Sequence, residues 1–272
     1  MVRSLWSAAT GMNAQQTNVD TIANNLANVN SAGYRAQKAE FKSLLYQTLQ
    51  TRTTTANGDP KPTTSQVGLG VRTSSINNIF TPGSFLASES NTSFAIGGDG
   101  FFALRGEDGN TYYTRNGDFT WAMGNNGGLV LTNQDGLPVL TTTGREITLN
   151  RNYIANRITI TEDGEVCYPD ERNNPQPIGL KIGLYQFNNP GGLERTGDTL
   201  FRPTAASGVA LNEETNANLQ RSRVVQGYLE GSNVSVADEM VNLIVAQRAY
   251  EMNSKAITTS DSMMDTANNL KR

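Results

Sequence analysis

Apolar residues recur at heptad spacing near both ends of the chain. Residues 3–30 contain two such series, Leu5, Met12, Val19 and Leu26, and then Ala8, Gln15, Ile22 and Val29. Residues 235–268 contain Val236, Leu243, Tyr250, Ile257 and Met264, flanked by Met240, Ile244, Ala246 and Gln247. Each pattern predicts an amphipathic helix with one apolar seam. Two long terminal helices of this kind can pair with each other as a coiled coil does.

The ends of these helices carry their own signals. Ser235, followed by Asp238, predicts the start of the second helix through a capping box. Gly33 offers a stop for the first helix, because glycine adopts the left-handed conformation at little cost. An amide cluster precedes that stop, namely Asn24, Asn25, Asn28 and Asn30. We expect these amides to bond neighbouring chains when packed and to stay soluble otherwise. An ordinary helical hairpin inside a monomer is the alternative.

Between the helices, the pattern changes to short strands and turns. Asn or Asp precedes Gly in dipeptides that begin at 57, 99, 108, 116, 126, 135 and 163, and such pairs favour tight turns with positive φ. The intervening runs are rich in branched and aromatic residues, at 94–98, 101–104, 111–115, 128–132, 157–161, 180–187 and 223–230. The fold class is therefore expected to be α+β, with a mainly antiparallel β domain inserted into a helical domain.

Residues 48–72 fit neither pattern. Pro60 and Pro62 interrupt any helix, and the Thr-rich stretch before them has no amphipathic period. Composition alone predicts an extended surface loop or a long hairpin. The expected domains are a terminal helical assembly domain (residues 1–47 with 231–272), an extended segment (48–75) and a β-rich domain (76–230).

Composition excludes several partners. The 272 residues carry a net charge of −3 without a basic run, which leaves no electrostatic footprint for nucleic acid or an anionic membrane. No run approaches the roughly 18 apolar residues of a membrane-spanning helix. The N-terminal apolar run is also too short for a secretory signal. We therefore expect no nucleic-acid partner, no insertion in a membrane and no cleaved signal peptide.

The sequence indicates no catalytic, cofactor or metal site. There is no histidine, which removes His-based acid–base catalysis, Ser-His-Asp triads and His-ligated zinc. Cys167 is the only cysteine, so no intrachain disulfide can form, and we expect a partly buried thiol. Residues 97–100 lack the spacing and the lysine of a phosphate loop and predict a strand–turn–strand. Glu162, Asp163 and Glu165 could serve a glycosidase, but exposed acids beside a turn are the commoner arrangement.

Three stretches resemble the signatures of the bacterial flagellar rod and hook axial protein family. Residues 3–35 resemble its N-terminal signature, in which an Asn-rich helix end is followed by Gly, an aromatic residue and a basic residue. Residues 227–264 resemble its C-terminal signature, and residues 94–104 its central strand motif. Within the family, RSLW, QQTN, FKSLLYQTL (41–49) and the Gly-Leu-Gly at 68–70 are most similar to members from the distal part of the rod.

The resemblance implies a structural subunit of the bacterial flagellar basal body. Members leave the cell through the flagellar export apparatus and stack as a helical homopolymer, a rigid tube that crosses the periplasm and transmits torque to the hook. Implied partners are further copies of the chain, proximal rod proteins, the hook protein or hook junction, the export apparatus and the surrounding ring proteins. The alternatives are a hook or proximal rod position, or a carbohydrate-active β protein.

The assembly contacts are expected on the terminal helices. They are Leu5, Met12, Val19, Ile22, Asn24, Asn25, Leu26, Asn28, Val29, Gly33, Val236, Met240, Leu243, Ile244, Tyr250, Ile257 and Met264. The resemblance also ties residues 48–72 to a straight, rigid rod, because hook members lack this extension. The expected stiffening residues are Thr54, Asn57, Pro60, Pro62, Gly68 and Gly70. We further expect the termini to fold only on assembly.

Overall fold

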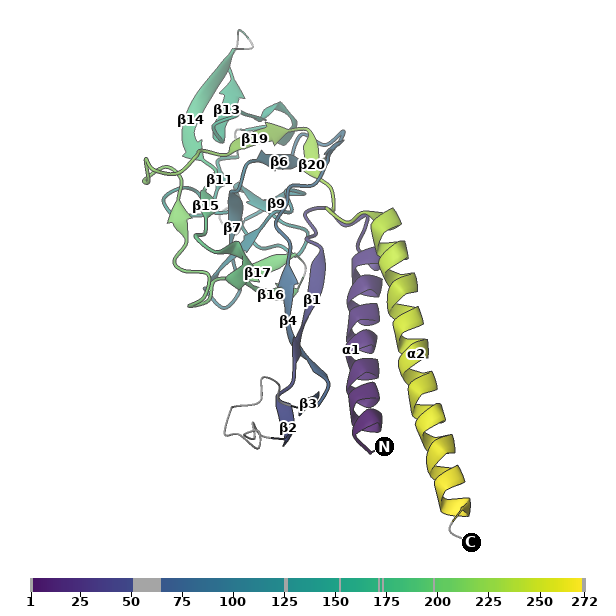
Figure 1. Ribbon diagram of the computed structural model, residues 1–272. Helices are drawn as coiled ribbons and strands as arrows, with labels where there is room; N and C mark the ends of the chain where they lie inside the picture. Colours follow the sequence, from purple (N-terminus) through teal and green to yellow (C-terminus); the bar gives the residue numbers. More distant parts are fainter. Residues whose placement is uncertain are drawn as a thin grey trace. The chain divides into compact units, whose positions relative to one another are not determined.

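The computed structural model describes residues 2–50, 65–124, 127–151, 153–170, 172, 174–197 and 199–270. These residues form one long helix near each end of the chain and a largely antiparallel β region between the helices (Figure 1). The expected α+β class is confirmed at this level. The chain divides into two compact units. The first unit consists of Met1–Ala27, Gln37–Asn78 and Ser235–Arg272, and the second consists of Asn28–Ala36 and Ile79–Val234.

The first unit contains both long helices, α1 (Val2–Ala27) and α2 (Val236–Asn269), which pack side by side (Figure 1). Because α1 ends at Ala27, Gly33 is not its C-cap, and the prediction of a stop at Gly33 is wrong. Ser235 is the N-cap of α2, so the predicted start is confirmed, but its side chain makes no capping bond and the capping box is wrong. Asp238 and Glu239 lie in the first turn of α2, where their negative charges interact favourably with the positive end of the helix dipole.

A two-stranded ribbon packs against α1 within the first unit. Strand β1 (Gln37–Ser43) pairs antiparallel with β4 (Val71–Asn78), and both strands contact α1. The sequence analysis did not predict β1. Beyond these strands, β2 (Tyr46–Gln50) pairs with β3 (Ser65–Gly68), so two strands border residues 51–64, which lie outside the described part of the chain. Gly70 has a φ of +109°, and a side chain at this position would collide with Thr10 of α1.

The second unit consists of short strands, and every pairing that the structure describes is antiparallel. Its sheets have the strand orders β16-β17-β8-β7-β15-β18, β11-β10-β9, β12-β13-β14, β19-β6 and β20-β5. The bounds are β5 (Phe85–Ala87), β6 (Phe94–Gly97), β7 (Phe101–Arg105), β8 (Thr111–Thr114), β9 (Thr120–Met123), β10 (Leu129–Thr132), β11 (Thr148–Leu149), β12 (Thr159–Ile160), β13 (Glu165–Pro169), β14 (Pro175–Lys181), β15 (Leu184–Gln186), β16 (Glu194–Gly197), β17 (Leu200–Arg202), β18 (Leu211–Asn212), β19 (Arg223–Gln226) and β20 (Tyr228–Glu230). Short 3-10 helices span Ala155–Arg157 and Pro190–Gly192.

Each predicted run contains a strand, but two long runs are interrupted by glycines. The run at 180–187 breaks between β14 and β15, where Gly183 lies so close to the Thr141 carbonyl that a side chain would not fit. The run at 223–230 breaks at Gly227, whose φ is +77°. The run at 157–161 keeps only the two residues of β12. Glycine therefore ends the strands of the first two runs earlier than the apolar pattern indicates.

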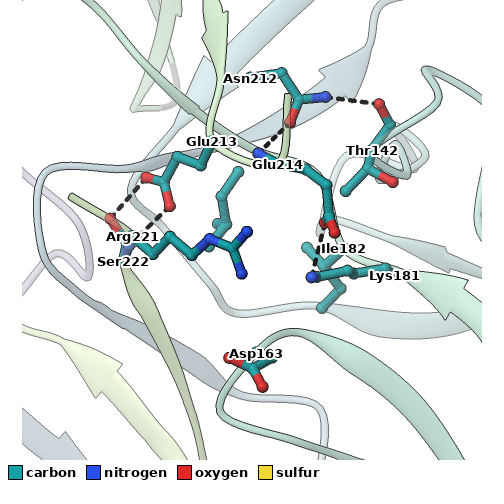
Figure 2. A pocket seen from close by; sticks show the side chains of 10 residues that line it. Thr142, Asp163, Lys181, Ile182, Asn212, Glu213, Glu214, Arg221 and Ser222 are labelled. Atoms are coloured by element: carbon teal, nitrogen blue, oxygen red, sulfur yellow. Dashed lines mark hydrogen bonds and ion pairs between the residues drawn. The ribbon is translucent and has the colours of Figure 1, made fainter. Parts of the chain in front are cut away.

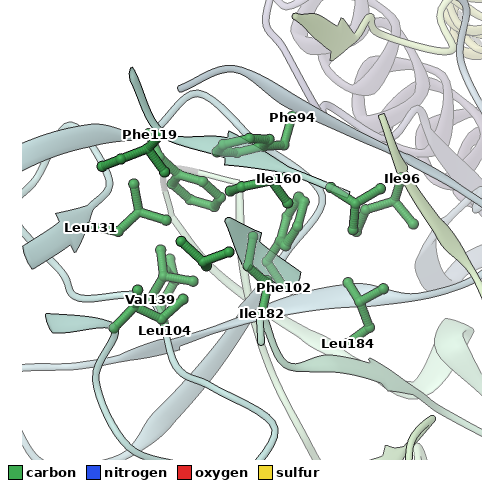
Figure 3. Packing of buried hydrophobic residues seen from close by; sticks show 14 of the residues in the cluster. Phe94, Ile96, Phe102, Leu104, Phe119, Leu131, Val139, Ile160, Ile182 and Leu184 are labelled. Carbon is green, nitrogen blue, oxygen red and sulfur yellow. The ribbon is translucent and has the colours of Figure 1, made fainter. Parts of the chain in front are cut away.

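Strand β7 lies between two hydrophobic clusters. Phe102 and Leu104 belong to the larger cluster, which Figure 3 shows, whereas Phe101 and Ala103 belong to a second cluster on the opposite face. A strand that is buried on both faces carries a continuous apolar run, as the sequence FFAL does. The second cluster is mainly aromatic, and the Phe101 ring lies edge-on to the Phe187 ring at 5.6 Å. β7 is thus the central strand of the β unit.

The Gly-rich turn before β7 is a strand–turn–strand, as expected, but its glycines have different roles. Gly98 has a φ of +141°, whereas Gly100 and Gly117 do not have the positive φ that the dipeptide pattern predicts. Gly100 instead allows a close approach, because a Cβ there would lie 2.6 Å from Oε1 of Glu213. A side chain at Gly117 would collide with the Phe94 carbonyl. These two positions require a small residue, not a left-handed backbone.

Candidate assembly surface

The contact between α1 and α2 includes small and polar residues. Ser4 Oγ lies 3.2 Å from Ser260 Oγ, and Ala246 is the buried residue of α2. A Cβ added to Gly11 would lie 2.9 Å from Nδ2 of Asn253, so the Asn253 side chain would have to move to admit a methyl group. Gly11 thus allows the Asn253 side chain of α2 to lie close to α1.

The residues of the predicted seams differ in burial. On α1, Ala8 and Ile22 are buried, while the other seam residues are partly exposed; these are Leu5, Met12, Gln15, Val19 and Leu26. Val29 is partly exposed in the turn after α1. On α2, Leu243, Ile257 and Met264 are partly exposed. The remaining predicted residues of α2, which are Val236, Met240, Ile244 and Tyr250, expose between 42% and 55% of their surface.

A second apolar stripe on α2 is more exposed than the predicted seam. Val241, Val245, Met252 and Met263, here called the outer stripe, are 60%, 62%, 72% and 57% exposed. Spacings of four, seven and eleven residues place them on one side of the helix. These residues lie outside the heptad series through Leu243, so that series does not predict them. The run MVNLIV (240–245) was the available signal, since it places apolar residues on more than one helix face.

The amides at the end of α1 bond within the chain. Asn25 is 1% exposed; its Nδ2 donates to the Gln37 carbonyl at 2.8 Å and to Oε1 of Glu239 at 3.2 Å, and its Oδ1 accepts from the Gln37 amide at 2.8 Å. Asn24 Nδ2 donates to Oε1 of Gln37, and Asn28 Oδ1 accepts from the Ser31 hydroxyl. Asn25 therefore joins α1 to β1 and to α2.

Glu239 is the ionisable member of this amide network. Partial burial raises the pKa of its carboxyl group, the hydrogen bond from Asn25 lowers it, and the neighbouring Asp238 raises it, with a net upward shift. The charged form of Glu239 is therefore less favourable in the folded chain than in water.

A buried cluster of three charged side chains, Arg35, Arg115 and Glu230, lies in the second unit, where residues 33–36 meet residues 230–233. Arg35 Nη2 lies 2.6 Å from Oε1 of Glu230, and Arg115 Nε lies 3.1 Å from Oε2 of the same carboxylate. The exposed fractions of these side chains are 0% for Arg35 and Glu230 and 3% for Arg115. Burial lowers the pKa of Arg115, although Glu230 opposes this shift. Gly33, with a φ of +69°, donates its amide to the Glu230 carbonyl at 2.7 Å.

The residues considered for carbohydrate chemistry do not form a catalytic pair. Glu162, Asp163 and Glu165 lie at or beside the turn between β12 and β13, and Glu162 is exposed and 3.7 Å from Arg223. Asp163 lines a small cavity of about 30 Å³ (Figure 2). That volume holds about one or two water molecules and no sugar ring. Several of its other polar groups interact with each other, as in the Lys181–Glu214 ion pair at 2.7 Å.

Of the residues predicted to stiffen the rod, the structure describes Gly68 and Gly70. Gly68 ends β3, and Gly70 lies against α1. Thr54, Asn57, Pro60 and Pro62 lie outside the described residues.

Over the described ranges, no cluster of three or more acidic or cysteine residues could hold a metal ion. No described helix is long and apolar enough to cross a membrane. Cys167 is a buried free thiol whose pKa is raised by burial.

Three family models match successive parts of the chain. The model described as flagella basal body rod protein matches residues 5–35, which cover most of α1 and the turns after it. The model described as flagellar hook protein FlgE/F/G D1 domain matches residues 95–168 of the β unit. The model described as flagellar basal body rod FlgEFG protein C-terminal matches residues 225–270, which include α2. The matches thus include both long helices and the central strand β7.

Full-length relatives come from distant bacteria. A protein of Borreliella burgdorferi is 46% identical, with all of both chains covered. A protein of Buchnera aphidicola subsp. Schizaphis graminum is 41% identical over 97% of this chain and 98% of its own. A protein of Agrobacterium fabrum is 40% identical over 96% and 97%. All three are named flagellar basal-body rod protein FlgG.

Proposed function

The chain belongs to the family of flagellar basal-body rod and hook proteins, whose members are structural, and within this family we propose that it is the subunit of the distal rod. In this role it polymerises with copies of itself into a rigid helical tube, which transmits torque to the hook. The relatives described above are named rod proteins, and this chain matches them over almost their whole length, which favours a rod position over a hook position.

One observation supports polymerisation above the others, namely the outer stripe of α2. An apolar stripe of this length on a helix is unfavourable in water and favourable against another apolar surface. Burying one of these side chains fully would contribute about 1.5 to 3 kcal/mol. The occupant that we propose is a second copy of this chain, because the relatives are subunits of one structure, the rod. Contacts that lead from one copy to the next without closing produce a helical tube.

We propose that the helices carry the assembly contacts in a coiled-coil-like arrangement. The exposed and partly exposed seam residues are the direct contacts, together with the outer stripe and Trp6, which is 67% exposed on α1. Asn25 and Gly33 are buried, so their proposed role is to hold the helix ends in place. The expected domains keep their proposed roles, with assembly by residues 1–47 and 231–272, stiffening by 48–75 and an outward-facing β domain at 76–230.

The location and the other partners follow from the same proposal. The subunit is exported by the flagellar export apparatus without a cleaved signal peptide and lies in the periplasmic part of the basal body. It contacts proximal rod proteins at one end of the distal rod and the hook protein or hook junction at the other. The surrounding ring proteins contact its outside.

We further propose that the terminal helices fold fully only when subunits assemble. Ala246 is the buried residue of α2 in the single chain, so an isolated pair gains little from burial, while ordering both helices costs conformational entropy. Limited proteolysis of the free subunit tests this proposal. Residues 3–30 and 240–270 should be cut well before residues 90–210, and equal resistance of all three regions would show that the helices are already stable.

The function itself is tested by electron microscopy of basal bodies from the source bacterium after deletion of this gene. A shortened rod without a hook is expected, and the normal rod should return when the gene is restored. A full-length rod that lacks only its hook would assign the chain to the hook instead. An intact axial structure would refute the proposal.

A further inference from the structure

A groove in the β unit is lined by aromatic, proline and polar side chains. It has a volume of about 410 Å³ and lies over β13, β14 and the 3-10 helix Ala155–Arg157. The Tyr153 and Tyr168 rings form its apolar surface, with their centres 4.9 Å apart and their planes at 71°. Pro169, Pro177 and Ile178 extend this surface. The volume lies within the range of small-molecule binding sites.

Three polar side chains line the same groove. Arg157 places its guanidinium carbon 5.9 Å from the centre of the Tyr168 ring, and Asp170 and Gln176 complete the lining. Tyr168 and Gln176 are paired across β13 and β14, so the antiparallel register fixes an aromatic ring and an amide side by side. The groove thus offers a flat apolar surface bordered by donors and acceptors of hydrogen bonds.

The charged side chains of the groove favour a ligand without net charge. Arg157 and Asp170 have opposite charges, so the lining carries no net charge and a charged ligand gains no overall attraction. A peptide could add as a strand to the free edge of β14, but Pro175 and Pro177 supply no backbone N–H for such pairing. A neutral ligand with an apolar face and many hydroxyl or amide groups matches all of these features.

We propose that this groove binds a neutral oligosaccharide. The apolar face of a sugar ring lies against the tyrosine and proline surface, while its hydroxyl groups bond with the carboxylate of Asp170, the amide of Gln176 and the guanidinium of Arg157. Tyrosine suits this contact because its ring is apolar and its hydroxyl group remains a hydrogen-bonding group. The site binds without hydrolysis and lies outside both long helices, so it does not depend on the proposed place in the rod.

Binding is measured on the full chain by titration, with amide signals followed by ¹H–¹⁵N nuclear magnetic resonance. The probes are triacetylchitotriose and maltotriose, two neutral trisaccharides that differ in their acetamido groups. At least one probe should shift the signals of residues 153–157, 168–170 and 176–178, with a dissociation constant on the order of 1 mM. A synthetic proline-rich peptide serves as the competing ligand class.

Two variants and a control distinguish stacking from a change of fold. Tyr168→Ala and Gln176→Ala should each weaken binding by about tenfold, which corresponds to about 1.4 kcal/mol. Gln176 is exposed, so its replacement should leave the fold intact. Tyr228→Ala removes another exposed tyrosine, in β20, and should leave binding unchanged. The proposal is overturned if neither trisaccharide shifts the groove signals, if only the peptide does, or if both groove variants bind as the parent chain does.

Discussion

Replacing Val245 by aspartate tests whether the outer stripe carries assembly. Val245 is 62% exposed in the subunit, so the substitution removes little surface that is buried within one chain. Exposed substitutions of this kind usually change the free energy of unfolding by no more than about 0.5 kcal/mol. Folding of the subunit and assembly of the rod are therefore affected to different extents.

The effect on assembly has two parts. Burying a whole valine side chain contributes about 1.5 kcal/mol, so the exposed 62% of Val245 represents about 1 kcal/mol for a contact with a neighbour. The aspartate would also bury a carboxylate without a partner, at a cost of about 3 kcal/mol or more. The sum of about 4 kcal/mol weakens each contact by about a thousandfold.

The assay uses the source bacterium without its native copy, complemented by the parent gene, by Val245→Asp or by Val209→Asp. Val209 is 80% exposed in the β unit, so the control makes the same chemical change away from the helices. Electron microscopy of isolated basal bodies counts full-length rods, and swimming in soft agar provides a second measure. Purified subunits are compared by thermal unfolding.

We expect parent-like rods with Val209→Asp and few or none with Val245→Asp, while the three purified subunits melt at similar temperatures. Normal numbers of full-length rods with Val245→Asp would show that the outer stripe is not buried in the rod. Equal loss of rods in both variants would show that added charge, and not its place on α2, is responsible.

Three further predictions concern the single subunit. Glu230→Gln leaves Arg35 and Arg115 buried without their counter-charge. It should lower the free energy of unfolding by about 3 to 5 kcal/mol and the melting temperature by about 10 °C. The control Glu162→Gln changes an exposed ion pair and should alter the melting temperature little. In urea unfolding, Gly33→Ala should lower the free energy of unfolding more than Gly136→Ala does. Both glycines have a positive φ, but only a side chain at Gly33 would also collide with Asn116. Gly136→Ala should cost about 1 to 2 kcal/mol, and an equal loss in both variants would contradict the collision. Because folding raises the pKa of Glu239, the folded chain binds that proton more tightly than the unfolded chain does. The melting temperature should therefore fall as the pH rises above the ordinary pKa of 4.5. Melting curves of Glu239→Gln over the same pH range should show a smaller fall than those of the parent chain.

The sequence predicted both long helices and the strands of seven apolar runs, because their patterns are local. Heptad spacing located α1 and α2, and the runs at FAIG and FFAL located β6 and β7. The ends of elements were less predictable, since they depend on contacts with distant residues. The helix α1 ends at Ala27, and Gly33 instead donates its amide to the Glu230 carbonyl, which is far away in the sequence. Gly100 is likewise explained by Glu213 and not by its own turn.

The candidate surface was predicted only where periodicity reported it. A single heptad series cannot reveal residues of a second face, so Val241 and Val245 were missed. Nor could it indicate that Asn25 would be buried against β1, because the polar strand QKAEFKS has no clear strand pattern. The partnership of Arg35 with Glu230 spans 195 positions of the sequence, and no local rule pairs charges at such a separation.

The pairing of α1 with α2 also affects the order in which the chain folds. Ser4 meets Ser260 across 256 positions, so the first helix leaves the ribosome long before its partner is made. The β unit consists mostly of nearer contacts and can close while α2 is still being synthesised. Joining the two ends requires closing one long loop, whose entropic cost grows only slowly with length once the β unit has shortened the free chain. A nascent chain thus completes its middle first and its ends last.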